Sequence, residues 1–195
     1  MDRPAALAIV FTLAAIAAGC ASSPEHLYTL SPTATPSAAA SKLSVAVGPV
    51  SVPAAVDRPQ IVVSTSANQV TVDDFNRWAA PLQDNLARVV AENLVALLGS
   101  PRVTLFPQTL NADVDYRVQI EIRNFESAPG KSASLDAVWT VRRTKDGKTE
   151  TGRTSAREKV DGDGYEALAA AHSRGVARLS QDIADVVRAL DRPAP

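Results

Sequence analysis

The 195-residue chain has a single cysteine, Cys20, and its charges nearly cancel, leaving a formal net charge of -1. A lone cysteine cannot close an intramolecular disulfide, so the fold depends on packing alone. A near-neutral chain also lacks the basic face that nucleic-acid binding requires. Its Lys and Arg residues form no polybasic cluster that would attract an anionic membrane surface. Composition therefore excludes a nucleic-acid-binding protein and favours one ordinary core, since 46% of the residues are hydrophobic.

The motifs of common enzyme classes are missing as well. The chain has no glycine-rich phosphate loop and no Gly-x-Ser-x-Gly nucleophile motif. Of its two histidines, His26 lies in a Ser/Pro-rich segment and His172 lies on the apolar face of a predicted helix, where a core role is favoured. Asp161-Gly162-Asp163-Gly164 begins like a calcium loop, but Tyr165 stands where an oxygen ligand is required. We therefore predict a protein that is not an enzyme and holds no cofactor or metal.

The N-terminus has the pattern of an export signal. Arg3 is followed by an apolar run from Ala5 to Ala18, which is too short to span a bilayer as a helix. The run ends in Ile16-Ala17-Ala18-Gly19-Cys20, which resembles the bacterial lipobox, although Ala17 replaces the usual Leu. We expect residues 1–19 to be a lipoprotein signal peptide and Cys20 to be the lipid-attachment residue. The alternatives are an ordinary signal peptide with a stray thiol and a short uncleaved anchor.

The next segment has the composition of a linker. Residues 20–41 are rich in Ser, Pro, Thr and Ala and offer little apolar surface to bury, so we expect a flexible, lipid-anchored tether. Within it, Leu27-Tyr28-Thr29-Leu30 is prone to form a strand. This island is either a short strand that docks on the domain's sheet or an apolar spot in the linker. The folded domain is expected to span residues 42–192.

Alternation of apolar and polar residues predicts the strands of this domain. The pattern is clearest from Val114 to Arg123 and continues from Leu135 to Val141, where Trp139 and Ile120 are expected to face the core. Shorter strands are predicted around residues 45–52, 61–63, 70–72 and 103–105. A turn at residues 145–148 leads to a polar return strand, residues 149–160, which we interpret as an exposed sheet edge or a partner-facing surface.

Two helices are predicted from spacings of three and four between apolar residues. In the first, Asp73 and Asp74 are candidate N-terminal caps, Pro81 marks the start of the regular helix, and Gly99 ends it. The second follows Gly164 and carries an apolar stripe to Leu190. Together these elements predict an α+β two-layer sandwich, with a mainly antiparallel sheet and both long helices on one face.

Several segments in a fixed order resemble one protein family. They are the strand-loop-strand unit from Val50 to Val62, Arg77-Trp78-Ala79-Ala80-Pro81-Leu82, Tyr28-Thr29-Leu30 and Ala91-Glu92-Asn93-Leu94. With the lipobox, they resemble the ABC-type transport auxiliary lipoprotein family from about Tyr28 to Leu190. The resemblance implies an α/β sandwich and a periplasmic lipoprotein, generally at the outer membrane. It also implies partners: an ABC transporter or membrane subunits, and a mammalian-cell-entry (MCE) domain protein that moves lipids between membranes.

Six residues are candidates for contact with such a partner: Asp57, Arg58, Pro59, Arg77, Trp78 and Arg153. For the Asp57-Arg58-Pro59 loop, the structural alternative is that Pro59 sets an extended entry to a strand while Arg58 pairs with a carboxylate. For Arg77-Trp78, the alternative is core packing of the indole with the guanidinium nearby, and the patterns favour it.

Two functions remain open at this point. One is a non-catalytic adaptor that ties a lipid-transport assembly to the outer membrane and supports envelope integrity. The other is a carrier that holds an acyl chain between the helices and the sheet, which would need a sizeable dry cavity. Ala21 after the cysteine, rather than Asp, favours the periplasmic face of the outer membrane over the inner membrane. A homo-oligomer is left open.

Overall fold

The computed structural model describes residues 24–37, 40–107 and 113–192. Its main layer is a five-stranded sheet in the order β5-β2-β6-β7-β8. These strands are β2 (Val45–Ser51), β5 (Val103–Leu105), β6 (Tyr116–Ala128), β7 (Ser132–Arg143) and β8 (Thr149–Lys159). The predicted hairpins are confirmed: β6 pairs antiparallel with β7, and β7 pairs antiparallel with β8. β2 lies parallel to both β5 and β6, so the sheet is mixed.

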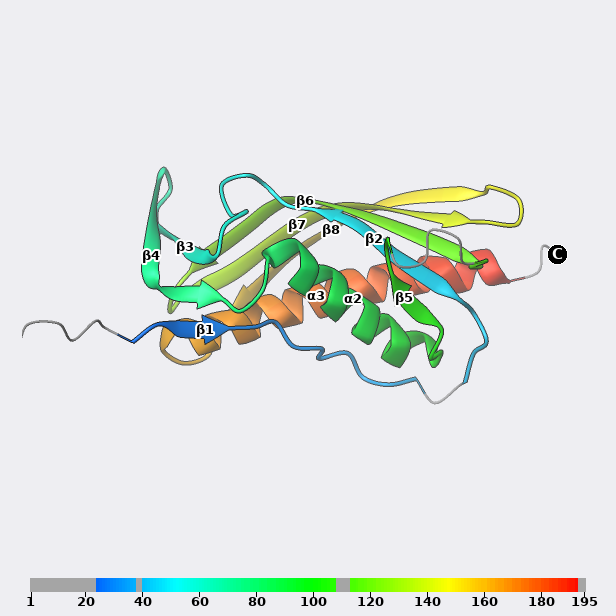
Figure 1. Cartoon of the computed structure of the whole chain (residues 1–195), viewed down its shortest axis with the longest axis horizontal. Coiled ribbons are helices and arrows are strands. Elements are labelled where there is room, and N and C mark those ends of the chain that lie inside the picture. The colour runs from blue at the N-terminus through cyan, green and yellow to red at the C-terminus, as the bar shows by residue number, and fades with distance from the viewer. Residues whose placement is uncertain (1–23, 38–39, 108–112, 193–195) are drawn as a thin grey trace, which may run out of the picture.

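Both long helices cover one face of this sheet (Figure 1). Helix α2 (Leu82–Leu98) contacts β2 and β5, helix α3 (Gly164–Asp191) contacts β7 and β8, and the two helices contact each other. The start of α2 after Pro81 and its end at Gly99 are as predicted; Gly99 adopts a left-handed conformation with φ 61. The predicted α+β sandwich is therefore confirmed.

The core lies between the helices and this sheet. Ile120 and Trp139, predicted to face it, are 3% and 5% exposed. The side chains of α3 that meet the sheet are fully buried, among them Val176, Leu179 and Ile183. The alternation in β6 and β7 was informative because one face of the sheet is packed and the other meets water.

A second, three-stranded sheet has the order β1-β4-β3. It contains β1 (His26–Tyr28), β3 (Gln60–Ser66) and β4 (Gln69–Trp78), and it lies at one end of the molecule, on the left in Figure 1. Its long β4 strand corrects the prediction that Asp73 and Asp74 cap a helix. The three-and-four spacing through Phe75 and Trp78 is typical of a helix, but β4 bulges there, since Gln60 pairs with Arg77 and Ile61 with Asp73.

The N-terminal segment is not a flexible tether over residues 26–37. β1 pairs parallel with β4, which confirms the docked-strand interpretation of the Leu27–Leu30 island. Beyond it, Leu30 is 1% exposed. The Thr33 and Ala34 amides donate to Asn93 Oδ1 in α2, at 3.1 Å each, and the Ser37 amide donates to the carbonyl of Ala96 at 2.8 Å. The segment thus crosses the helices on the side opposite the sheet. Cys20 and the predicted signal peptide lie outside the described residues.

Candidate functional site

Two of the predicted contact segments are neighbours in space. The Trp78 amide donates to the carbonyl of Pro59 at 2.7 Å, and Gln60 pairs with Arg77 across the small sheet. The loop before β3 is a compact turn, in which the amides of Val56 and Asp57 both donate to the carbonyl of Pro53. Asp57, Arg58 and Pro59 are all exposed at its surface. The loop is therefore positioned by the end of β4 and open to a partner.

Trp78 does not belong to this exposed surface. Its side chain is 5% exposed and packs edge-on against Phe125 and His172, with ring centroids 6.1 and 6.4 Å apart. Its prediction as a contact residue is wrong, because the indole fills the core where the small sheet meets β6. Arg77, next to it, points outward: its Nη1 lies 2.7 Å from Glu25 Oε1, and its Nε donates to the carbonyl of Asp74.

A hollow lies beside the loop. It has a volume of about 400 Å³ and is bounded by the turn, by β3 and by β6, with Pro53, Val56, Val62 and Phe125 among its lining residues. Its charged lining residues are Arg123 and Glu126, both on β6. Such a shallow, partly apolar hollow next to an exposed arginine has the chemistry of a protein contact.

Arg153 lies apart from this group. It is on β8, the strand at the edge of the five-stranded sheet, and pairs across the strands with Asp136 of β7. The neighbouring residue Thr154 is buried and bonds to Asp182 of α3, so Arg153 points to the open face of the sheet. The candidate residues therefore divide into a loop cluster (Asp57, Arg58, Pro59 and Arg77) and a separate sheet-face residue (Arg153).

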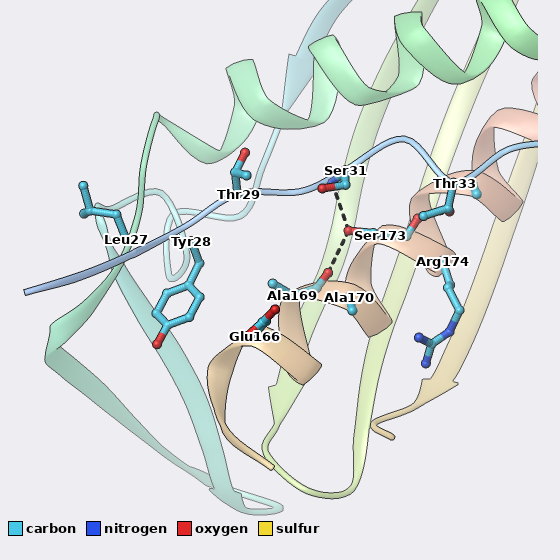
Figure 2. Close-up of a pocket in the computed structure, with 11 residues that line it drawn as sticks. Leu27, Tyr28, Thr29, Ser31, Thr33, Glu166, Ala169, Ala170, Ser173 and Arg174 are labelled. Carbon is cyan, nitrogen blue, oxygen red and sulfur yellow. Dashed lines mark hydrogen bonds between the residues drawn. The ribbon is translucent and has the colours of Figure 1, made fainter. Parts of the chain in front are cut away.

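A larger groove was not predicted. It lies between residues 27–33 and helix α3, with a volume of about 810 Å³ (Figure 2). Ala169, Ala170 and Ala177 form its apolar side, and Ser31, Thr33 and Ser173 supply hydroxyl groups. Ser173 Oγ accepts a hydrogen bond from the Ser31 amide at 3.1 Å and donates to the Ala169 carbonyl at 2.8 Å. The strand-prone island was a sequence signal for one side of this groove, and the alanines of the last helix were compatible with the other, but the two segments are far apart in the chain.

The buried histidine, His172, is part of the core packing. His172 is 1% exposed, and desolvation lowers its pKa to about 3, so the imidazole is neutral at ordinary pH. Its Nε2 lies 2.8 Å from Ser127 Oγ, and its ring stacks on Phe125 at 3.9 Å. Ser127 is also buried, so this Ser–His pair is closed to a substrate. The sequence interpretation of a core histidine is confirmed.

A hydrogen-bond cluster ties the small sheet to α3. Tyr165 donates to Asp73 Oδ2 at 2.7 Å, and this bond lowers the pKa of the Asp73 carboxyl, while burial raises the pKa of the Tyr165 hydroxyl. Tyr28 donates to Asn76 Oδ1 at 2.8 Å. Asp73, predicted as a helix cap, instead holds the bulge of β4, since its Oδ1 accepts from the amides of Phe75 and Asn76.

Two further observations concern the described residues alone. Neither α2 nor α3 combines the length and apolar character needed to cross a bilayer. Within the same residues, the His, Asp, Glu and Cys side chains form no group that could hold a metal ion.

Comparisons with known proteins show which fold and which family the chain shares. Solved structures share its fold: one of an uncharacterised protein is 21% identical, with a TM-score of 0.69, and covers 85% of this chain and 99% of its own. A DUF330-family protein from Xanthomonas campestris is 19% identical, with a TM-score of 0.66, and covers 84% of this chain and 99% of its own. No curated protein matches. A family model, described as the ABC-type transport auxiliary lipoprotein component, matches residues 28–184. Because this match spans most of the chain, the protein belongs to the ABC-type transport auxiliary lipoprotein family.

Proposed function

We propose that this protein is a non-catalytic adaptor of an ABC-type transport system that moves lipids between membranes. In this proposal Cys20 carries the lipid anchor at the periplasmic face of the outer membrane. The folded domain captures an MCE-domain protein or the membrane subunits of the same system. Family membership supplies the link to ABC-type transport. The observation that carries the adaptor role is the filled interface between helices and sheet, because it leaves the surface as the working part of the domain.

The packing of that interface is dense. Trp139 and Ile120 of the sheet and Val176, Leu179 and Ile183 of α3 are all buried in one hydrophobic cluster. An acyl chain between the layers would have to displace these side chains, and emptying or overfilling a packed core costs several kcal/mol. The geometry therefore favours the adaptor over a carrier that holds lipid between helices and sheet.

The groove in Figure 2 supports a narrower form of the carrier alternative, because alanines line one side of it and its volume of about 810 Å³ suits an extended ligand. A lipid in this groove would lie outside the core. Ala170→Trp would fill the groove, since Ala170 is an exposed residue among its lining. Extraction of lipid from the purified protein before and after this substitution, quantified by mass spectrometry, separates the two functions.

We predict that Cys20→Ser moves the protein from the membrane fraction to the soluble periplasm while the domain stays folded. The physical reason is that each buried methylene of an attached acyl chain contributes about 0.8 kcal/mol to membrane binding, and a Ser cannot take the thioether-linked chains. Cell fractionation with immunoblotting is the measurement, and an unchanged melting temperature is the control for folding. A serine variant that stays in the membrane pellet would contradict the lipid anchor.

We predict that Arg58→Glu weakens capture of the MCE-domain partner while shifting the melting temperature little. Exposed charges contribute below about 1 kcal/mol to stability, but they steer association and set the register of an interface. Arg153→Glu tests the open sheet face in the same way. Arg178→Glu, at an exposed position on α3, is the matched control for an added negative charge. Pull-down with the purified partner is the measurement. Two results together would contradict the adaptor: lipid bound at one molecule per protein, and partner capture that neither Arg58→Glu nor Arg153→Glu changes.

A further inference from the structure

Exposed apolar side chains gather on the small sheet. Among the described residues, the large hydrophobic side chains that stand open to solvent are Leu27, Val70, Phe75, Val95 and Phe106. Leu27 lies on β1, and Val70 and Phe75 lie on β4, so most of this set belongs to two paired strands. Leu27 and Phe75 are 61% and 50% exposed. In Figure 2, Leu27 points away from α3 while its neighbour Tyr28 points toward it.

The β3–β4 hairpin, whose second strand carries Val70 and Phe75, is largely free of charge as well. From Pro59 to Val72 the sequence contains no Asp, Glu, Lys, Arg or His. This stretch forms β3, the turn at Ala67-Asn68 and the first part of β4. A surface of Ser, Thr, Asn, Gln and Val can approach lipid headgroups without desolvating a charge, which would be costly. Charged residues surround this stretch: Arg58 and Asp73 flank it in the sequence, and Arg123 and Glu126 of β6 line the hollow beside it, so the approach is limited to headgroup depth.

Chain length brings this end of the domain to the membrane. The inference rests on the proposed lipid attachment at Cys20. From Cys20 to Pro24, the first described residue, there are four residue steps, which span at most about 14 Å when fully extended. A folded domain of this size has a radius of gyration of about 15 Å. The connection from Cys20 to the folded domain is therefore short compared with the domain itself. β1 begins at the end where the β3–β4 hairpin lies (Figure 1), so that end is held against the bilayer.

We propose that the small sheet is a membrane-contact surface, on which Leu27, Phe75 and the uncharged β3–β4 hairpin touch the headgroup layer of the bilayer that holds the Cys20 lipid. The bilayer is the occupant because the short connection from Cys20 ends on β1 of this sheet, beside the exposed Leu27 and Phe75 and the uncharged hairpin. The contact orients the domain, so that the open sheet face and the opposite end, with the β7–β8 turn, project into the periplasm toward partners.

The test uses the mature lipidated protein, reconstituted into vesicles of phosphatidylethanolamine and phosphatidylglycerol. Cys20 is the one cysteine of the chain, and lipidation consumes its thiol, so an introduced cysteine can be labelled alone. A polarity-sensitive fluorophore is placed at Leu27→Cys, Phe75→Cys or Asn68→Cys, and at Lys148→Cys in the β7–β8 turn as the distant control. We expect blue-shifted emission and quenching by a headgroup-level nitroxide lipid at the first three positions, and neither effect at position 148.

A matched pair of variants strengthens the test. With the label at Asn68→Cys, the double change Leu27→Ser and Phe75→Ser is expected to reduce nitroxide quenching, whereas Val95→Ser on α2 leaves it unchanged. Equal quenching at positions 68 and 148, in protein that sediments with the vesicles, would overturn the inference and leave the anchor intact. A blue shift in detergent that grows with protein concentration would also overturn it, by showing a contact between copies. Protein that stays in the supernatant with a reactive Cys20 thiol would overturn the lipid attachment itself.

Discussion

Replacing Trp139 with alanine is expected to destabilise the domain by about 3–5 kcal/mol, a large part of the margin of about 5–15 kcal/mol that folded domains have. The indole is buried between β7 and α3 and donates from Nε1 to Thr154 Oγ1 at 3.0 Å. Thr154 in turn donates to Asp182 Oδ2 at 2.6 Å, so the substitution also breaks a link between sheet and helix. Urea unfolding followed by circular dichroism measures the change.

The control for this prediction is Thr140→Ala, one position along the same strand, where the hydroxyl makes an exposed contact with Thr151. Its expected effect is below about 0.5 kcal/mol. Gly152 offers a second check, because it pairs with Trp139 across the strands and any Cβ there would overlap the indole ring. Gly152→Ala should destabilise the protein with Trp139 present and cost much less in the Trp139→Ala background. Equal costs in both backgrounds would show that the indole does not lie over Gly152.

Lowering the pH from 6.5 to 4 is expected to reduce stability by about 3 kcal/mol through His172 alone. Burial lowers the pKa of His172 to about 3 in the folded protein, below its ordinary value of 6.5. The unfolded chain therefore takes up a proton as pH falls through 6.5, and the folded chain does not until pH is near 3. Within that window stability falls with decreasing pH, by up to about 1.4 kcal/mol for each pH unit.

The measurement is the free energy of unfolding in urea at several pH values. The matched variant is His172→Phe combined with Ser127→Ala, which keeps a ring stacked on Phe125 and removes both partners of the buried polar contact. This variant is expected to lose the slope that His172 causes and to keep the loss of stability at lower pH. There the unfolded chain protonates Asp73 and Asp115 near their ordinary pKa of 3.8, whereas hydrogen bonds lower these pKa values in the folded protein. An unchanged slope would show that His172 titrates normally.

The sequence predicted those elements whose pattern reflects one burial environment. β6 and β7 were predicted well because every second side chain is buried against the helices. The start of α2 was predicted because Pro81 has a local effect on the backbone. β4 was mistaken over Asp73–Trp78 because its apolar side chains serve different surroundings: Trp78 enters the core, whereas Phe75 sits exposed in a bulge. The spacing of apolar residues alone cannot distinguish such a bulged strand from one apolar face of a helix.

The candidate site was predicted in part for a related reason. The loop at residues 57–59 and Arg77 flank one hairpin, so their proximity follows from local pairing. The docked path of residues 29–37 does not follow from local pairing, because the residues that hold it are far along the chain. Arg88 donates to the Leu30 carbonyl, Asn93 accepts from two amides, and Ser173 accepts from a third. Composition described the segment's own residues correctly as poor in apolar surface, but the polar side chains that hold it belong to α2 and α3.

That docked segment has a mechanical consequence. A pull on the N-terminus acts along β1, which lies parallel to β4, and then along residues 29–37. Their bonds are spread along α2, at Arg88, Asn93 and Ala96, and reach α3 at Ser173. Force applied in this direction loads those bonds together, in shear, rather than opening them one after another as in a zipper. When the anchored end and the partner-bearing surface move apart, the tension passes into the helical layer and leaves the free edge at β8 unloaded.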